Sequence, residues 1–410
     1  MARSYTHEVV IIGGGAAGIA TAASLLKRRP LLDIAIIEPS EHHYYQPGWT
    51  MVGGGVFDAP VTCRPMASVM PKRTRWIRQA AATFHPEDNQ LTLRDGSTIA
   101  YRLLIVAPGI RLAWEQIEGL EQTLGRNGVT SNYRYDLAPY TWNLVRTLRS
   151  GRAIFSQPPM PIKCAGAPQK AMYLSCDAWA DRGVLGDIDV EFRNAGGVLF
   201  GVKEYVPALM EYVEKYGIDL KLNQTLVAVD GPAKTATFKT EAGEETVAFD
   251  MLHAVPPQVA PAFVADSPLA QAESGFVDID PITLRHVRYP NVFGLGDAGS
   301  SPNAKTAAAV RKQAPIVAVN ALAVLDDKQP VADYDGYGSC PLTVERGKIV
   351  LAEFGYGGKL LPSLPTWLID GTRPRRLSWL LKSEALPWIY WNGMLKGHEW
   401  LARPQVKTAA

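Results

Sequence analysis

The segment at residues 9–41 constrains the fold of this chain more than any other stretch. It opens with an apolar, β-branched run at residues 9–12, which is typical of a strand buried on both faces. Three glycines follow on the spacing G-x-G-x-x-G, at Gly13, Gly15 and Gly18. A helical pattern over residues 19–27 and a second apolar strand over residues 33–37 then lead to Glu38. Because such glycines let a turn approach a pyrophosphate at a helix N-terminus, and the acid binds ribose hydroxyls, the segment predicts a dinucleotide-binding βαβ unit.

Two later segments indicate which dinucleotide is bound. Residues 289–297 end a strand in Gly-Leu-Gly-Asp, with Asp297 last, and a helix is expected to start near Thr306. This pattern resembles the flavin-closing motif of flavoproteins with two dinucleotide-binding domains, in which the aspartate meets the ribityl chain. The strand at residues 103–109 ends in Ala-Pro-Gly109 and resembles the Ala-Thr-Gly motif of the same proteins, with proline in place of threonine. The three motifs, in this order, predict FAD.

A second unit is inserted at residues 128–261. Strand and helix patterns alternate there as in the first unit, which predicts a second Rossmann-like domain. The expected strands lie at 153–155, 188–192, 219–222 and 251–255, and the expected helices at 169–181 and 205–216. The first strand-to-helix turn of this copy lacks the glycine motif and instead carries prolines at Pro158, Pro159 and Pro161. Because proline has no N–H to donate to a phosphate, this turn disfavours NADH.

The same turn carries Cys164 directly before the predicted helix. A helix N-terminus and the nearby ammonium groups of Lys163 and Lys170 favour a thiolate, which would lower the pKa of this cysteine from roughly 8.5. Gly166 is expected to allow the close approach of a planar ligand. We therefore expect redox chemistry at Cys164.

The other cysteines are harder to assign. Cys340 lies in a turn-rich stretch at residues 334–342, and its function depends on whether it reaches Cys164. A direct disulfide needs Cα atoms about 4.4–6.8 Å apart, whereas a bridging sulfur tolerates more. Cys63 and Cys176 are expected to be structural. The four cysteines are too few for a disulfide scaffold, and neither they nor the seven histidines have metal-ligand spacing, so no metal site is expected.

Bulk properties narrow the function further. The formal net charge of +2 over 410 residues does not indicate a nucleic-acid partner. The N-terminal sequence lacks the pattern of a cleavable signal peptide. No run of about 18 apolar residues predicts a transmembrane helix, so any contact with a membrane is expected to be interfacial.

The C-terminal region predicts such a contact. Five of the ten tryptophans fall between residues 367 and 400, where arginines and lysines alternate with short apolar runs. This composition is typical of a helix that lies in a bilayer interface. The alternative is a helical cap over the sheet edge or a dimer interface. An interfacial tail beside a flavin implies an apolar electron acceptor, for which a quinone is the natural choice.

Together these segments resemble the sulfide:quinone oxidoreductase family, most closely the type found in mitochondria and some bacteria. The resemblance spans nearly the whole chain, and its most specific stretches are residues 44–50, 161–170, 305–310 and 337–341. It implies an α/β fold with two Rossmann-like dinucleotide-binding domains, as in disulfide-reductase-like flavoproteins, plus a C-terminal interfacial helical region. The FAD domain is expected at residues 1–127 and 262–325, the second domain at 128–261, and the redox-cysteine and membrane region at 326–410.

The resemblance also implies a chemistry. Hydrosulfide attacks a sulfur bridge between Cys164 and Cys340, Cys340 carries the persulfide and the Cys164 thiolate attacks the flavin, although the reverse assignment stays open. Sulfite, glutathione or a second sulfide then removes the sulfane sulfur. FAD is expected to be non-covalent and to be bound by Gly13, Gly15, Gly18, Glu38, Gly109, Asp297 and Lys305.

Reduced FAD would pass its electrons to a quinone, with Phe354, Tyr390 and Trp391 as the expected contacts. Lys170 and Lys382 are expected to attract the anionic substrate or to stabilise a thiolate. We expect a peripheral, monotopic attachment to the inner or cytoplasmic membrane, and a homo-oligomer is allowed.

Two other functions stay open. A type II NADH:quinone oxidoreductase has a similar layout, although the prolines of the second domain disfavour it. A flavoprotein subunit of a sulfide dehydrogenase would instead pass electrons to a cytochrome and use the tryptophan-rich tail as a protein-docking surface. The kind of quinone, the sulfur acceptor and the oligomeric state are not specified by the sequence.

Overall fold

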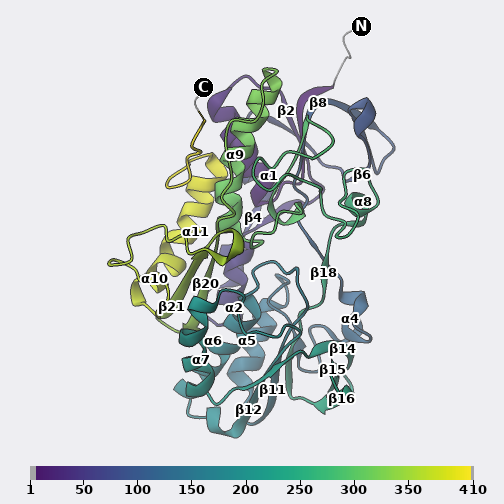
Figure 1. Cartoon of the computed structure of the whole chain (residues 1–410). Coiled ribbons are helices and arrows are strands. Elements are labelled where there is room, and N and C mark those ends of the chain that lie inside the picture. The colour runs from purple at the N-terminus through teal and green to yellow at the C-terminus, as the bar shows by residue number, and fades with distance from the viewer. Residues whose placement is uncertain (1–5, 408–410) are drawn as a thin grey trace.

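The computed structural model describes residues 6–407, which form two α/β lobes with the C-terminal segment packed along their side (Figure 1). The first lobe holds a seven-stranded sheet in the order β5-β2-β1-β8-β7-β6, with β19 also paired to β8. Strands β5, β2, β1, β8 and β19 run parallel, and β7 and β6 continue the sheet as antiparallel strands. Their bounds are β1 His7–Ile12, β2 Ile34–Ile37, β5 Thr74–Ile77, β6 Ala81–His85, β7 Gln90–Leu93, β8 Thr98–Val106 and β19 Val292–Gly294.

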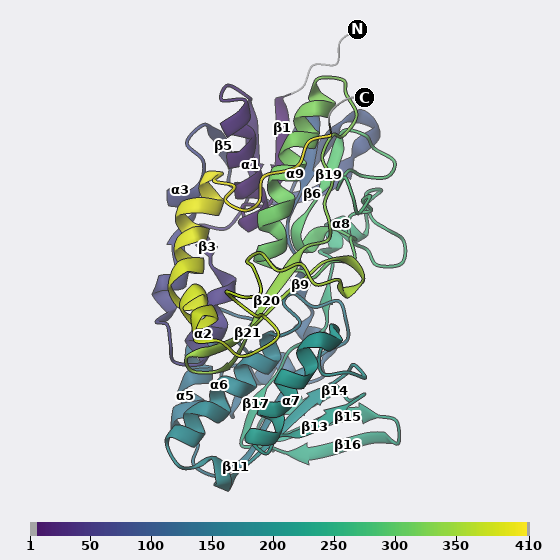
Figure 2. The same ribbon diagram turned by 60° about the vertical axis from the view of Figure 1, so that its left-hand side comes forward.

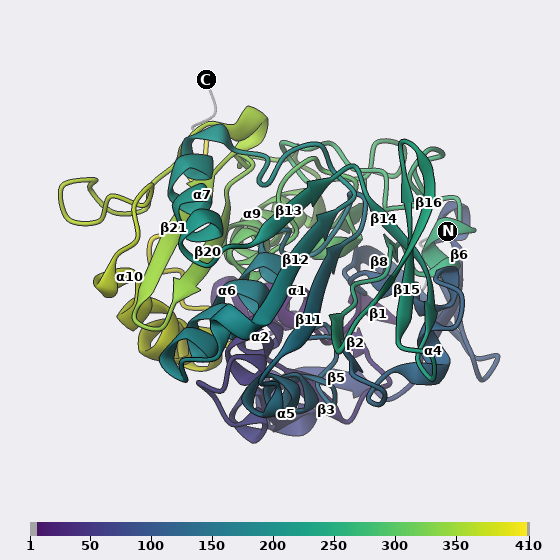
Figure 3. The same cartoon turned by 90° about the horizontal axis from the view of Figure 1, so that it is seen from below.

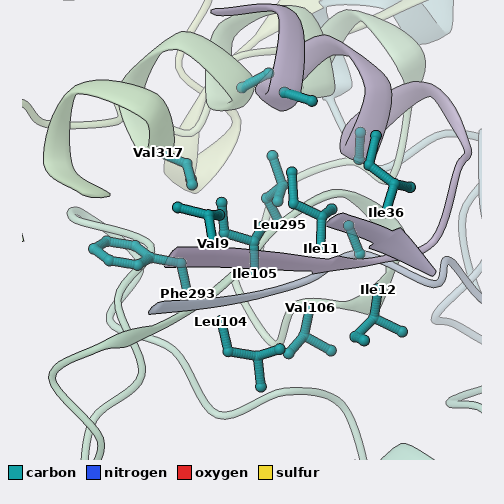
Figure 4. Close-up of a cluster of buried hydrophobic side chains, with 14 of the residues drawn as sticks. Val9, Ile11, Ile12, Ile36, Leu104, Ile105, Val106, Phe293, Leu295 and Val317 are labelled. Carbon is teal, nitrogen blue, oxygen red and sulfur yellow. The ribbon is translucent and has the colours of Figure 1, made fainter. Parts of the chain in front are cut away.

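The core of this lobe follows from the β-branched run that opens the chain. In register, Ile11 of β1 lies between Ile36 of β2 and Ile105 of β8, and all three are buried. Val9 and Ile11 point toward the helices on one face, whereas Leu104 and Val106 point to the other (Figure 4). A strand with apolar residues on both faces is stable only where both faces are covered, as in a parallel sheet.

Two helices cover the face of this sheet that carries Ile11. They are α1, Ala16–Arg28, and α9, Ala307–Leu325, which pack against each other. Thr306 caps α9, since its hydroxyl accepts a hydrogen bond from the backbone N–H of Ala309 at 3.1 Å. Among the described residues, α9 is the one helix long and apolar enough to cross a membrane, but 61% of its apolar window is buried inside the protein. The packing of α9 is therefore that of a core helix.

The second lobe, seen from below in Figure 3, has a five-stranded parallel sheet in the order β10-β17-β11-β12-β13. The strands are β10 Val129–Thr130, β11 Gly151–Gln157, β12 Ile188–Asn194, β13 Asp219–Leu222 and β17 Met251–His253, and the helices are α5 Ala138–Thr147, α6 Ala167–Asp181 and α7 Val206–Lys215. The predicted alternation of strands and helices is confirmed. An antiparallel sheet of β14 Thr225–Asp230, β15 Thr235–Thr240 and β16 Gly243–Ala248 was not predicted.

Short elements connect these parts. They are β3 His42–Tyr44, α2 Trp49–Gly53, β4 Cys63–Pro65, α3 Met66–Val69, β9 Arg111–Leu112, α4 Leu120–Thr123, β18 Gln258–Val259 and α8 Ala262–Ala265. Strands β9 and β18 pair where the chain passes between the lobes.

The C-terminal segment has a β-hairpin followed by a helical region. The hairpin pairs β20, Gly338–Glu345, with β21, Lys348–Phe354. The helical region begins with α10, Arg376–Leu380, passes through wider π-helical turns on either side of α11, Leu386–Trp388, and lies beside α1 (Figure 2). The expected loop around Cys340 is wrong, because the apolar residues of this stretch form strand β20, which packs on α6.

Candidate active site

The fold brings together two cysteines that lie 176 residues apart in the chain. Cys164 precedes α6, Cys340 lies on β20, and their Sγ atoms are 3.4 Å apart. A covalent disulfide has an S–S length of about 2.05 Å, so no direct disulfide joins the two cysteines. The sequence could not supply this distance, since it depends on how the hairpin packs against the second lobe.

The backbone around Cys164 is held from several sides. Cys164 has a positive φ of 50°, a conformation that residues other than glycine seldom adopt. Its N–H donates to the carbonyl of Lys305 at 2.8 Å, on the loop that precedes α9. The buried Tyr133 hydroxyl lies 3.1 Å from the carbonyl oxygen of Lys163 and 3.3 Å from that of Cys164. Sequence reasoning missed Tyr133, because nothing in its local pattern links it to this turn.

Gly166 has a different role from the one expected. A Cβ atom at this position would lie 2.6 Å from the Sγ of Cys340 and 2.2 Å from the Cδ2 of Leu342. The missing side chain therefore makes room for Cys340 and its strand, not for a planar ligand.

We expect Gly166→Ala to push β20 away from Cys164 and to lower the rate of any reaction that uses both cysteines by about tenfold or more, because overpacking shifts the backbone. The rate is compared with that of Gly186→Ala, since a Cβ at Gly186 meets no atom within 4 Å. Equal rates in the two variants would show that the packing around Gly166 does not set the spacing of the cysteines.

A buried lysine contacts the cysteine pair. Lys170, on the first turn of α6, is 2% exposed and its Nζ lies 3.0 Å from the Sγ of Cys164. The pKa of Cys164 lies well below its usual value, because the Cys340 thiol donates a hydrogen bond to it and Lys170 and Lys382 place positive charge nearby, against the opposing effect of burial. The pKa of Cys340 is raised well above its usual value by the same hydrogen bond and by burial. Cys164 is therefore the thiolate of the pair.

A second lysine reaches the pair from the C-terminal region. Lys382 lies in the π-helical turn at Leu381–Ala385 and is 4% exposed. Burial, together with the nearby charge of Lys170, lowers the pKa of Lys382 to about 7. Lys163 does not point to the cysteine pair. Its Nζ donates a hydrogen bond to the side-chain oxygen of Gln46 at 2.8 Å, and its charge interacts with that of Asp297. Of the two lysines nearest Cys164 in sequence, only Lys170 contacts its sulfur.

The first βαβ turn has the shape that a dinucleotide requires. A Cβ at Gly13 would lie 2.4 Å from the carbonyl oxygen of Ala107, and one at Gly18 would lie 1.9 Å from that of Gly13. A Cβ at Gly15 would meet nothing within 4 Å, so this face of the loop is open. Glu38 lies against the same loop and accepts a hydrogen bond from the N–H of Gly14 at 2.7 Å.

The loop after β19 lies beside the start of α1, since a Cβ atom at Gly296 would lie 3.1 Å from the Cβ of Ala17. Burial raises the pKa of Asp297, opposed by the charges of Lys305 and Lys163. Lys305 donates to the carbonyls of Asp297 and Gly299 at 2.9 and 2.7 Å, so its ammonium group holds the loop in place. Gly109 has a φ of 82° and faces open space. These features fit FAD: an open glycine loop, an acid beside it, and a buried aspartate on the loop that lies next to the start of α1.

Comparison with the sequences of known proteins identifies the family. The sequence model of the family described as pyridine nucleotide-disulphide oxidoreductase matches residues 7–165. A mitochondrial sulfide:quinone oxidoreductase from Dictyostelium discoideum is 41% identical over 395 residues, which cover 95% of this chain and 86% of the relative. The chain belongs to the sulfide:quinone oxidoreductase family. The mitochondrial sulfide:quinone oxidoreductase from Mus musculus is 38% identical, over 96% of this chain and 87% of the relative.

A solved structure supports the fold. The sulfide:quinone oxidoreductase from Aquifex aeolicus superposes with a TM-score of 0.78 at 20% identity, covering 95% of this chain and 92% of that one. The predicted family and the predicted fold, with two dinucleotide-binding domains, are confirmed.

The three side chains expected at the quinone do not lie together. Phe354 ends β21 and contacts Phe200 of the second lobe, with ring centroids 6.0 Å apart. Tyr390 and Trp391 are buried in the core of the first lobe, where both contact His43.

The remaining cysteines lie apart from the redox pair. Cys176 is buried within α6, and Cys63 lies half-buried on β4, paired with Tyr44 of β3. Within residues 6–407, no group of three His, Cys, Asp or Glu side chains is arranged to hold a metal ion.

Proposed function

We propose that this enzyme oxidises sulfide to sulfane sulfur at Cys164 and Cys340 and passes the electrons through FAD to a quinone. The observation that carries the proposal is the pair of sulfur atoms 3.4 Å apart beside the buried Lys170, in a chain of this family. We assign FAD binding to residues 1–127 and 262–325, the second domain to residues 128–261, and the remaining redox and membrane contacts to residues 326–410.

The spacing of the cysteines suits a bridging sulfur atom. Two S–S bonds of about 2.05 Å that meet at one sulfur place the outer sulfurs roughly 3.3 Å apart, close to the spacing of Cys164 and Cys340. Attack of hydrosulfide on the Cys340 sulfur breaks its bond to the bridge and forms a persulfide there. The negative charge is left on the Cys164 side, where Lys170 stabilises it. The low pKa of Cys164 and the high pKa of Cys340 support this assignment of the two roles.

When bound, FAD would supply a two-electron acceptor for the cysteine pair and a donor for the quinone. Once an acceptor has taken the outer sulfur from Cys340, the Cys340 thiolate would bond to the sulfur anion held at Cys164, which re-forms the bridge and releases the two electrons. The residues that would hold FAD are Gly13, Gly15, Gly18, Glu38, Gly109 and Asp297, with Lys305 bracing the loop. We infer non-covalent binding, since Cys164 and Cys340 face each other, Cys176 is enclosed in α6, and Cys63 lies on β4, outside the glycine loop and the loop of Asp297.

An anionic acceptor would complete the cycle by removing the sulfane sulfur from Cys340. Sulfite, glutathione and a second sulfide all carry negative charge, and Lys382 adds positive charge to the site besides that of Lys170. Lys382 therefore attracts the acceptor, whereas Lys170 is engaged by Cys164.

For the quinone, we favour a contact with Phe354 over one with Tyr390 or Trp391. Phe354 is partly exposed, and its backbone forms an isolated antiparallel β-bridge with Leu360. The side chain of Leu360 is also exposed. Tyr390 and Trp391 are enclosed by the first lobe, so a quinone would have to displace core contacts to reach them.

We further propose that the C-terminal region attaches the enzyme to a membrane as a monotopic protein, at the inner or cytoplasmic membrane. Its exposed apolar side chains are Leu360, Trp367, Leu368, Leu377, Leu380, Trp388, Trp400, Leu401 and Val406. Trp388 and Trp400 stack with centroids 5.7 Å apart and line a surface hollow with Ile389 and Ala385. Aromatic side chains exposed in this way suit the headgroup level of a bilayer.

We expect the double variant Trp367→Glu, Trp388→Glu to stay in solution when the protein is floated with liposomes, whereas the wild type rises with them. The two tryptophans are 84% and 56% exposed, so charges there oppose burial in lipid without disturbing the core. Leu31→Glu is the control, since Leu31 is 88% exposed and lies outside the tail. If the wild type does not float, the tail is instead a docking surface for a protein, as in a flavoprotein subunit that reduces a cytochrome. If the double variant floats as the wild type does, these two tryptophans do not make the membrane contact.

The electron donor is tested by steady-state assays of short-chain quinone reduction. Sulfide is expected to support turnover and NADH is not, since the turn before α6 lacks the glycines that cradle a pyrophosphate. Turnover with NADH at a comparable rate would overturn the proposed donor.

A further inference from the structure

His43 joins two parts of the protein that are distant in sequence. It lies on β3, is 2% exposed, and its Nδ1 is 3.0 Å from the carbonyl oxygen of Gly14 in the dinucleotide loop. Its Nε2 is 2.7 Å from the hydroxyl of Tyr390 in the C-terminal helical region. Sequence reasoning did not single out His43, because its partners lie 29 and 347 residues away.

The partners of His43 specify its protonation. A carbonyl oxygen only accepts hydrogen bonds, so Nδ1 carries the proton and donates it to Gly14. Nε2 is then free to accept the hydrogen of the Tyr390 hydroxyl. Burial lowers the pKa of His43 to about 4, so the ring is neutral at physiological pH and both bonds form as described.

The Gly14 peptide is held on both sides. Its N–H donates to Glu38 at 2.7 Å, and its carbonyl accepts from His43. Gly14 stands between Gly13 and Gly15, so its position sets the shape of the open face where the pyrophosphate would lie. A glycine has no side chain with which to hold itself in place, and these two bonds supply the restraint.

The segment that carries Tyr390 is itself bound along α1, the helix that starts at this loop. Arg28 donates to both carboxylate oxygens of Glu399 at 2.5 and 2.9 Å, and Ser24 donates to the same carboxylate at 2.7 Å. The Nζ of Lys27 is 3.2 Å from the carbonyl oxygen of Gly397. The C-terminal segment therefore contacts α1 directly at its C-terminal end, and it reaches the loop before α1 through His43.

We propose that His43 is a positioning residue that links docking of the C-terminal helical region to binding of FAD at the dinucleotide loop. When that region is docked, Tyr390 orients His43, and His43 holds the Gly14 carbonyl. FAD binding and tail docking then strengthen each other, because a coupling free energy acts equally in both directions. The inference rests on FAD as the bound dinucleotide but not on the identity of the electron donor or acceptor.

The test measures the dissociation constant of FAD for the full-length protein by flavin fluorescence after removal and return of the cofactor. Tyr390→Phe removes one hydroxyl and is expected to raise this constant about three- to tenfold, the effect of one hydrogen bond. Tyr140→Phe is the matched control, since its hydroxyl contacts Gly128 near the second sheet. An unchanged constant for Tyr390→Phe would overturn the proposal.

A double-mutant cycle separates the link from a general loss of stability. His43→Leu removes both hydrogen bonds of the ring and should weaken FAD binding more than Tyr390→Phe does. In the His43→Leu background, Tyr390→Phe should have no further effect, because the hydroxyl acts through the ring. Additive effects would contradict this route. The cycle measures FAD binding and requires neither sulfide nor quinone. The role of His43 can therefore be disproved while the proposed function holds, and the proposed function can be disproved while the role of His43 holds.

Limited proteolysis tests the reciprocal effect. In the wild type, FAD is expected to slow cleavage within residues 376–400, and in His43→Leu this protection should be reduced. Cleavage of the wild-type tail at the same rate with and without FAD would show that the loop and the tail are independent.

Discussion

Cys164→Ser is expected to lower sulfide-dependent quinone reduction by about a thousandfold or more, since loss of a group that forms the covalent intermediate removes most of the catalysis. Serine is close to cysteine in size, but it cannot form the sulfur bridge with Cys340 and its hydroxyl ionises far less readily. FAD should remain bound, because the open glycine loop and Asp297 lie on other segments. The measurements are the steady-state rate and the flavin absorbance of the purified variant.

Cys340→Ser should lose activity to a similar extent, since the bridge needs both sulfurs. Cys63→Ser is the control, because Cys63 lies on β4, outside the pair. Wild-type activity in either Cys164→Ser or Cys340→Ser would contradict the assignment of the redox pair. A loss in Cys63→Ser equal to that in Cys164→Ser would show that a different sulfur takes part.

Lys170→Met is expected to shift the pH dependence of the reaction upward. In the wild type, the Lys170 ammonium helps hold the pKa of Cys164 low, so the thiolate persists at neutral pH. Without this charge the pKa rises, and the thiolate fraction at a given pH falls about tenfold for each unit of the rise. The loss of rate should be largest at neutral and mildly acidic pH and should shrink above roughly pH 8.5, where an ordinary thiol ionises.

The shift is measured from the rate of Cys164 alkylation in the reduced enzyme as a function of pH, compared with the rate of turnover. Lys203→Met is the control for loss of a lysine, because Lys203 is exposed on the 3₁₀ turn Lys203–Tyr205 that precedes α7. If Lys170→Met keeps the wild-type pH profile, the low pKa of Cys164 has another source, and the hydrogen bond from the Cys340 thiol becomes the leading candidate.

The parts of the fold with strong local signals were predictable. The run at β1 is apolar on both faces, and Gly13 and Gly18 occupy positions where any side chain would collide with backbone. Such constraints lie in consecutive residues, so the sequence predicts the first βαβ unit, α9 and four of the five parallel strands of the second sheet. It does not predict β10, which has only two residues.

The parts that depend on contacts between distant segments were not predictable. Cys340 was placed in a loop, although its stretch forms β20 against α6. Gly166 was assigned to ligand approach, although the space belongs to Cys340. Tyr133 and His43 each act through one or two hydrogen bonds to residues far away in the chain, and such bonds have no local sequence pattern. The redox pair itself was inferred from the family resemblance, and its spacing came from tertiary packing.

The central claim is that sulfide delivers electrons to the flavin through the cysteine pair. An anaerobic titration with sulfide, followed by addition of a short-chain quinone, tests it directly. The account predicts that stoichiometric sulfide bleaches the absorbance of oxidised FAD in the wild type, that the quinone restores it, and that Cys164→Ser shows neither change. A flavin that stays oxidised with excess sulfide, or that is bleached equally in Cys164→Ser, would contradict the account.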